Sequence, residues 1–197
     1  MVSAFIGRLR GLEHTRANME NLFRSSLIPK RDVEHLYGAI FLAVYAAFEA
    51  MVEDLFLKLL TRRVSGPRSV RSKAEFGSYS VARAIAFGGR PYVDWVPYDN
   101  TLKRAELHFY GARPFSKLSQ HEKGVIKDVC TIRNAVAHQS GYARKVFDRH
   151  IIARLTLAPR ERTPTAFLRS LHSSAPDVTR YEELVSELIS IARNLVA

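Results

Sequence analysis

A long apolar stretch in the first third of the chain constrains the fold more than any other feature. Residues 38–48 are apolar at nearly every position, and Glu49 closes this run. The run is too short to span a bilayer. The wider segment 32–63 suits a helix that is apolar almost all round, and other elements must surround such a helix. We therefore predict a central core helix over 32–63, with Asp32 as its N-cap and Gly66 and Pro67 ending it.

Helical spacing of apolar residues continues along most of the chain. The segment 3–23 has apolar residues three, four and seven positions apart. Two capping boxes, which begin at Ser119 and Thr179, predict the starts of two further helices. Together with predicted helices over 100–111, 119–138, 143–155 and from 179 to the C-terminus, the pattern indicates an all-α fold. We expect one domain over 1–197, a helical bundle with two long helices and a C-terminal helix.

Three details of this bundle are less regular. Residues 66–115 are expected to form an irregular insertion with helical and aromatic parts, including one or two short helices within 68–87. In the helix over 100–111, the inward side chains are predicted to be Leu102, Leu107 and Tyr110. Gly141 is predicted to stop the helix over 119–138. The basic segment 158–174 contains Pro159 and Pro164 and is predicted to be a surface loop.

The segment 119–138 is patterned as a helix with two apolar strips. At about 100° per residue, one strip contains Val125, Val129, Ile132 and Val136. A second, smaller strip contains Ile126, Cys130 and Ala137. Asn134 and His138 lie on roughly the opposite side, with Arg133 on the flank. Two apolar strips suggest two packing partners, the domain core and a second copy of the chain.

Arg133, Asn134 and His138 form a cluster whose residue types suit RNA cleavage. Arginine can hold a phosphate, and histidine can move a proton near neutral pH. The pattern Arg-Asn-x-x-x-His resembles the signature of the HEPN superfamily, and the upstream segment 41–55 resembles the long helix that precedes this signature in the RiboL-PSP-HEPN-like group. The resemblance implies a helical domain that cleaves RNA without a metal or another cofactor.

The resemblance also implies a mechanism. The ribose 2′-OH attacks the adjacent phosphorus, which leaves a 2′,3′-cyclic phosphate and a 5′-OH. His138 would act as general base or acid, Arg133 would stabilise the charge on the phosphorane, and Asn134 would orient His138 or hold a phosphate oxygen. One histidine cannot easily serve as both base and acid in a single step. A homodimer with a composite site, as in related ribonucleases, would supply two.

Two residues are predicted to support this site. Glu49 lies on the apolar helix between Phe48 and Met51, where an inward carboxylate needs a partner, and it could pair with Arg133. Tyr142 follows His138 by four positions. Some HEPN toxins have a tyrosine two positions after the histidine. Ser140 occupies that position here, which argues against that subgroup.

The chain is strongly basic, with a net charge of +11, which favours a polyanionic partner such as RNA. An arginine-rich composition also follows from a high-GC genome, and composition alone does not separate the two explanations. The RNA-binding candidates are Arg90, Trp95, Arg104, Arg144 and Lys145. For the loop around Trp95 a second interpretation is the stronger one, in which its aromatic residues pin the loop to the core.

The sequence also limits the cofactors and the cellular setting. Cys130 is the only cysteine, so an internal disulfide and a zinc site built on several cysteines are excluded. A helical Cys130 is expected to be a buried small side chain. No paired metal spacing occurs among the histidines, so no metal is expected. No signal peptide or membrane span is evident, and a cytoplasmic location is expected.

Three functions fit these features. The first is a dimeric HEPN endoribonuclease, for which the family suggests a toxin or anti-phage defence effector with an antitoxin or other partner protein. The second is a non-catalytic HEPN module that binds RNA or a protein. The third is a basic helical nucleic-acid binder unrelated to the family, which the absence of a helix-turn-helix pattern weakens. The presence of Arg133, Asn134 and His138 together favours the first over the second, because binding alone does not require the histidine.

Overall fold

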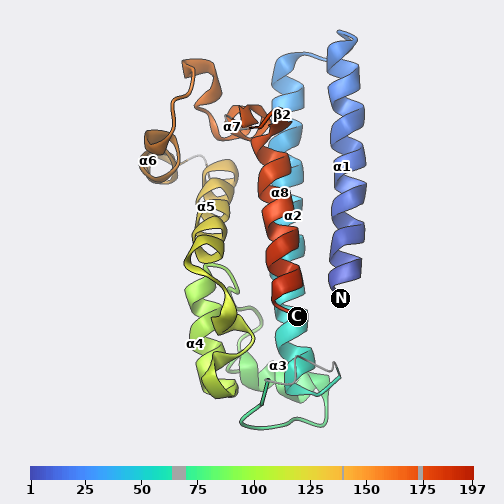
Figure 1. The fold of residues 1–197 in the computed structure, drawn as a ribbon, viewed down its shortest axis with the longest axis vertical. Helices are drawn as coiled ribbons and strands as arrows, with labels where there is room; N and C mark the ends of the chain where they lie inside the picture. The colour runs from blue at the N-terminus through green and yellow to red at the C-terminus, as the bar shows by residue number, and fades with distance from the viewer. Residues whose placement is uncertain (64–69, 139, 173–174) are drawn as a thin grey trace.

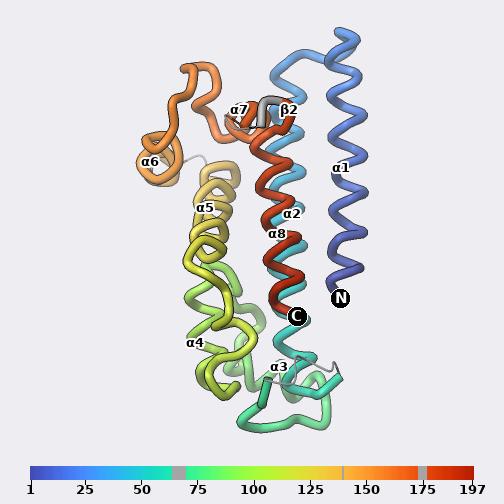
Figure 2. The backbone as a smooth tube through the Cα atoms, viewed as in Figure 1, coloured from blue at the N-terminus to red at the C-terminus, as the bar shows by residue number. Residues whose placement is uncertain are grey.

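The body of the protein consists of long helices packed around α2. The computed structural model describes residues 1–63, 70–138, 140–172 and 175–197. Helix α1 (Val2–Arg24) and helix α2 (Lys30–Leu60) form an antiparallel pair (Figure 1). Helices α5 (Gln120–Ala137) and α8 (Arg180–Asn194) also pack on α2. The tube in Figure 2 shows α8 returning alongside α2 at the end of the chain.

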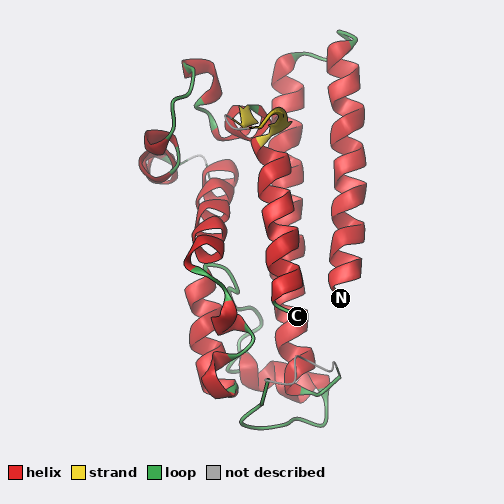
Figure 3. Ribbon diagram, in the orientation of Figure 1, coloured by secondary structure: helices red, strands yellow, loops and turns green. Residues whose placement is uncertain are grey.

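Shorter elements complete the fold, which is helical almost throughout its described part (Figure 3). The shorter α-helices are α3 (Tyr79–Ala86), α4 (Tyr98–His108), α6 (Gly141–His150) and α7 (Pro164–Arg169). Single 3-10 turns occupy Tyr110–Ala112, Phe115–Lys117, Ile152–Arg154 and Pro159–Glu161. Strands β1 (Leu171–His172) and β2 (Ala175–Thr179) form an antiparallel hairpin before α8. The predicted all-α fold is confirmed. None of the described helices is both long and apolar enough to cross a membrane.

Helix α2 is the central core helix, as its apolar sequence predicts. It contacts α1, α3, α5, α7 and α8. Its side chains Val33, Phe41, Val44, Phe48 and Phe56 are fully buried. The prediction of Asp32 as N-cap is wrong. The helix begins at Lys30 after Pro29, whose φ of −74° and ψ of 158° place it in the N-cap position, and Asp32 lies within the first turn. The predicted end at Gly66 and Pro67 lies outside the described residues.

The region after α2 is anchored by an aromatic cluster. The ring of Phe56 lies 4.9 Å from that of Trp95, 5.1 Å from that of Phe109 and 5.4 Å from that of Phe115. One short helix, α3, lies within 68–87 as expected, and α4 corresponds to the helix predicted over 100–111. The predicted inward orientation of Leu107 and Tyr110 is wrong, since both are exposed. Helix α4 starts at Tyr98, and its register turns Tyr98, Thr101 and Ala105 inward instead.

Two predictions about the later segments are also wrong, because a proline or glycine starts a helix there rather than ending one. The predicted basic loop over 158–174 contains α7, whose side chains Ala166, Phe167 and Leu168 are buried. Pro164 lies in the first turn of α7, where a missing N–H costs nothing, and Thr163 caps the helix. Gly141 is the first residue of α6, which Ser140 caps by accepting a hydrogen bond from the Ala143 amide at 3.2 Å.

Candidate functional site

Helix α5 places the Arg133–His138 motif at its C-terminal end. The predicted capping box starts the helix: Ser119 Oγ accepts from the Glu122 amide at 3.2 Å, and the Glu122 carboxylate accepts from the Ser119 amide at 2.7 Å. His138 is the C-cap residue, with an extended backbone of φ −116° and ψ 111°. Its amide donates to the Asn134 carbonyl at 2.9 Å. The helix therefore ends at the residue that carries the imidazole, and His138 is exposed.

Both apolar strips of α5 are covered by the same chain. Val129 and Ile132 are 1% exposed, Ile126 is fully buried, and Cys130 is 9% exposed. The helix contacts α2, α4, α7 and α8. Ala137 alone of the second strip is exposed. The second strip therefore does not need a second copy to cover it, and this part of the argument for a dimer was wrong.

Arg133 is half-buried and held on the α2 side of α5. Its guanidinium carbon lies 5.0 Å from the centre of the Tyr45 ring, and Nη1 donates to Asn134 Oδ1 at 2.9 Å. Asn134 Nδ2 in turn lies 3.9 Å from Cys130 Sγ. Among the described residues, Asn134 is the one hydrogen-bond partner of the Arg133 guanidinium. The other N–H groups of this guanidinium therefore remain to bind an anion. Burial raises the pKa of the Cys130 thiol, which fits its predicted role as a small buried side chain.

Asn134 and His138 face a pocket of about 350 Å³ between α5 and α6. Its lining consists of Thr131, Asn134, His138, Ser140, Tyr142, Ala143 and Val146. Tyr142 is 79% exposed at this pocket. The motif histidine, the motif asparagine and the predicted supporting tyrosine thus converge. Arg133 does not line the pocket and reaches it only through its bond to Asn134.

The predicted pairing of Glu49 with Arg133 is wrong. Glu49 Oε1 accepts from the Trp95 amide at 3.1 Å and from the Tyr92 hydroxyl at 3.4 Å. Among the described residues, no ion pair joins Glu49 to Arg133. The carboxylate does turn toward other protein groups, but its partner is the loop before α4, because that loop lies against this side of α2. Glu49 therefore holds the loop and does not orient the motif arginine.

The RNA-binding candidates separate into engaged and exposed side chains. Trp95 is fully buried, so it cannot stack on a base, and the interpretation of an aromatic loop pinned to the core is correct. Arg104 covers the Trp95 ring at 5.1 Å and donates to the Asp94 carbonyl. Arg144 pairs with Asp148 at 3.1 Å and donates to the Arg162 carbonyl at 3.0 Å. All three side chains therefore make contacts within the protein.

Two of the RNA-binding candidates are exposed. Arg90 follows α3, and Lys145 lies on α6, the helix that forms one wall of the pocket. Among the described residues, no group of three or more histidine, cysteine, aspartate or glutamate side chains could hold a metal ion. The pocket at His138 is therefore built from an imidazole, an amide, hydroxyl groups and apolar side chains.

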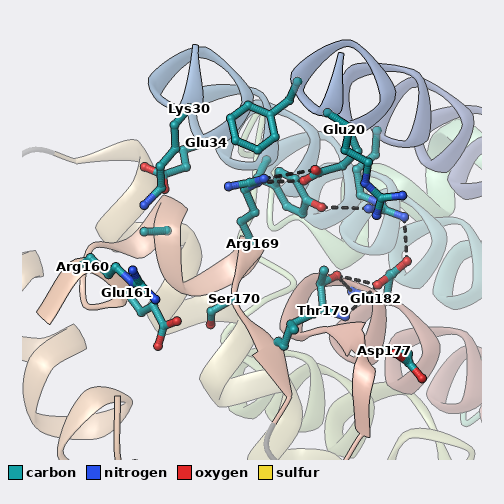
Figure 4. Close-up of a pocket in the computed structure, with 16 residues that line it drawn as sticks. Glu20, Lys30, Glu34, Arg160, Glu161, Arg169, Ser170, Asp177, Thr179 and Glu182 are labelled. Carbon is teal, nitrogen blue, oxygen red and sulfur yellow. Dashed lines mark hydrogen bonds and ion pairs between the residues drawn. The ribbon is translucent and has the colours of Figure 1, made fainter. Parts of the chain in front are cut away.

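A larger cavity than the one at His138 lies where α1, α2, α7 and the β-hairpin meet, and has a volume of about 450 Å³ (Figure 4). Several of the charged side chains that line it pair with one another. Arg16 is 9% exposed and donates to Tyr37 Oη at 2.8 Å and to Glu182 at 2.6 Å. Arg169 forms two hydrogen bonds with Glu20, at 2.8 and 3.1 Å. We interpret this cluster as an ion-pair clamp that joins α1 to α7 and α8. Sequence spacing does not predict it, because its partners are far apart in the chain.

The clamp is expected to make the protein sensitive to acid. Burial alone would raise the pKa of Glu20, but the hydrogen bonds from Arg169 and Tyr37 outweigh it and hold this pKa below its ordinary value. A carboxyl with a lowered pKa stabilises the fold above its unfolded pKa, and this contribution is lost as the pH falls through the folded pKa. The free energy of unfolding should therefore decrease as the pH drops below about 4.5.

Replacement of Arg169 tests the clamp and its effect on acid sensitivity. Arg169→Met should lower the free energy of unfolding at neutral pH by about 3 kcal/mol, because it leaves a largely buried carboxylate unpaired, and should weaken the acid dependence. Urea unfolding across pH measures both. The matched control is Arg154→Met, which breaks an exposed pair with Asp128 and should cost at most about 1 kcal/mol. Equal losses in the two variants would contradict the clamp.

Comparison with protein-family models, with curated proteins and with solved structures gives no match for this chain.

Proposed function

We propose that the protein is a metal-independent endoribonuclease of the HEPN type. The observation that carries the proposal is the convergence of Asn134 and His138 on an open pocket, with Arg133 bonded to Asn134 beside it. The exposed imidazole supplies proton transfer, and the guanidinium supplies a cation for a phosphate. The positive net charge favours a polyanionic substrate. The toxin or anti-phage role, an antitoxin partner and a cytoplasmic location follow from the family resemblance and belong to the same proposal.

In the proposed reaction, His138 takes the proton from the ribose 2′-OH as its oxygen bonds to phosphorus. The bond from phosphorus to the 5′ oxygen breaks, and that oxygen leaves with a proton. The products are a 2′,3′-cyclic phosphate and a 5′-OH. Arg133 stabilises the added negative charge, and Asn134 positions Arg133 through its Oδ1. Among the described residues that line the pocket, His138 is the only histidine. A second copy of the chain, in a homodimer, would supply the proton donor.

One observation favours a second candidate function. Arg133 lies outside the pocket lining and over Tyr45, an arrangement that also suits a non-catalytic module that binds RNA or a protein partner. Such a module would bind RNA through phosphate contacts, with an affinity that falls as salt rises. It would not produce cyclic phosphate ends.

Substitution of Arg133 separates these candidates. Arg133→Ala is expected to lower the cleavage rate by about 10²–10³-fold, as removal of one charge-stabilising donor does in other enzymes. Arg133→Lys keeps the charge but loses the planar pair of donors, so it should recover only part of the rate. Single-turnover cleavage of a labelled RNA measures the rate. Arg10→Ala, at an exposed position on α1, is the control and should cleave as the wild type does. Equal rates for all variants would contradict a catalytic Arg133.

A further inference from the structure

The side of α5 that faces away from the bundle carries a polar stripe. At about 100° per residue, Lys123, Lys127, Thr131 and Asn134 fall within about 80° of one another, and the stripe ends beside His138. Lys127 is exposed, and Lys123 and Thr131 are partly exposed. In Figure 1, α2 and α8 cover the other side of α5. The stripe is therefore a path on the surface that leads into the pocket.

Both lysines of the stripe lack a counterion among the residues that the structure describes. Neither Lys123 nor Lys127 makes an ion pair or a side-chain hydrogen bond with any residue that the structure describes. The acidic residues of α5 are engaged elsewhere. Glu122 caps the helix, and Asp128 pairs with Arg154 at 2.7 Å. The stripe itself therefore has two positive charges and no negative charge, which an external polyanion can complement.

The spacing of the stripe suits a phosphate backbone. Lys123 and Lys127 lie one turn apart, about 6 Å along the helix axis, and Asn134 lies about 10 Å beyond Lys127. Cations repeated at each turn can contact successive phosphates of an extended strand. We propose that this stripe binds the sugar–phosphate backbone of an unpaired RNA strand on one side of the cleaved bond. The position of the bound strand relative to the cleaved bond rests on the proposed cleavage at His138. Binding of RNA to the stripe does not rest on it.

The pocket end of the stripe favours an unpaired strand over a duplex. Tyr142 is 79% exposed there, and an exposed aromatic ring can stack on a base that is not paired. Val146 and Ala143, which line the same pocket, give an apolar surface next to the ring. In a duplex the bases are stacked on each other, so Tyr142 could not reach a base face.

The test measures RNA binding without cleavage. In the His138→Ala background, the affinity for a fluorescently labelled single-stranded oligouridine is measured over a range of salt concentrations. The test variant is Lys123→Gln/Lys127→Gln. The matched control is Arg8→Gln/Arg10→Gln, which removes the same charge from exposed positions on α1. In Figure 1, α1 lies on the far side of α2 and α8 from α5.

Loss of two phosphate contacts should reduce the slope of log affinity against log salt by about 1.4, while the α1 control keeps the slope of the background protein. The affinity of the test variant for an RNA duplex should change less than its affinity for the single strand. An equal slope for test and control variants would overturn the proposal, as would an equal loss for duplex and single strand. If the slope changes as expected but the wild type cuts no RNA, the binding stripe stands and the nuclease proposal fails.

Discussion

Replacing His138 with alanine is expected to lower the rate of RNA cleavage by about 10²–10⁴-fold, the contribution of a general acid or base. RNA binding should survive, because His138 is exposed at the end of α5 and the substitution removes no buried contact. Single-turnover cleavage gives the rate, and fluorescence anisotropy gives the affinity. His35→Ala, an exposed histidine on α2, is the control and should cleave at the wild-type rate.

The same variant tests whether two copies share one site. If each copy contributes part of a composite centre, a mixture of His138→Ala and Arg133→Ala proteins should recover part of the activity that each lacks alone. Light scattering of the mixture should then give the mass of a dimer.

A His138→Ala protein that cuts RNA as fast as the wild type, in a preparation free of contaminating nuclease, would remove His138 from the proposed mechanism.

Trp95→Ala is expected to lower the free energy of unfolding by about 3–5 kcal/mol, the usual cost of deleting a large buried aromatic side chain. The ring is fully buried, 4.9 Å from that of Phe56 and 6.0 Å from that of Phe87. Its Nε1 also donates to Glu53 at 2.9 Å. The substitution would leave a cavity and would remove one hydrogen bond from the Glu53 carboxylate, which keeps its ion pair with Arg83 at 3.8 Å. Urea unfolding followed by circular dichroism measures the loss.

A matched control comes from the neighbouring helix. Leu107→Ala removes a side chain that is 71% exposed and should change the stability by no more than about 0.5 kcal/mol. If Trp95 instead stacked on RNA, Trp95→Ala would weaken RNA binding and leave the stability unchanged. That result would contradict the packing of the loop against α2.

The sequence predicted the long helices well, because their signals are local. The apolar run of α2, the helical spacing of α1 and the capping boxes at Ser119 and Thr179 depend on residues within one or two turns of each other. Two of the errors arose where a residue type fits both the start and the end of a helix. Pro164 and Gly141 read as helix breakers, yet both lie at the start of a helix, where their backbone properties are tolerated.

The candidate site was predictable only in part. Asn134 and His138 share a side of α5 by spacing, so their convergence follows from the helix period. Val146 and Ser140 were missed, because their place in the pocket depends on the angle at which α6 leaves α5. The Glu49–Arg133 pair failed for a similar reason, since the loop at Trp95 reaches the carboxylate first. The clamp from Arg16 to Glu182 joins residues 166 positions apart, which no local pattern reveals.

Incubation of the purified protein with total RNA in EDTA, followed by analysis of the product ends, tests the central claim most directly. The account predicts cleavage by the wild type, with 2′,3′-cyclic phosphate and 5′-OH ends, and none by His138→Ala. Cleavage that stops in EDTA, or that leaves 5′-phosphate ends, would contradict the proposed mechanism at Arg133 and His138.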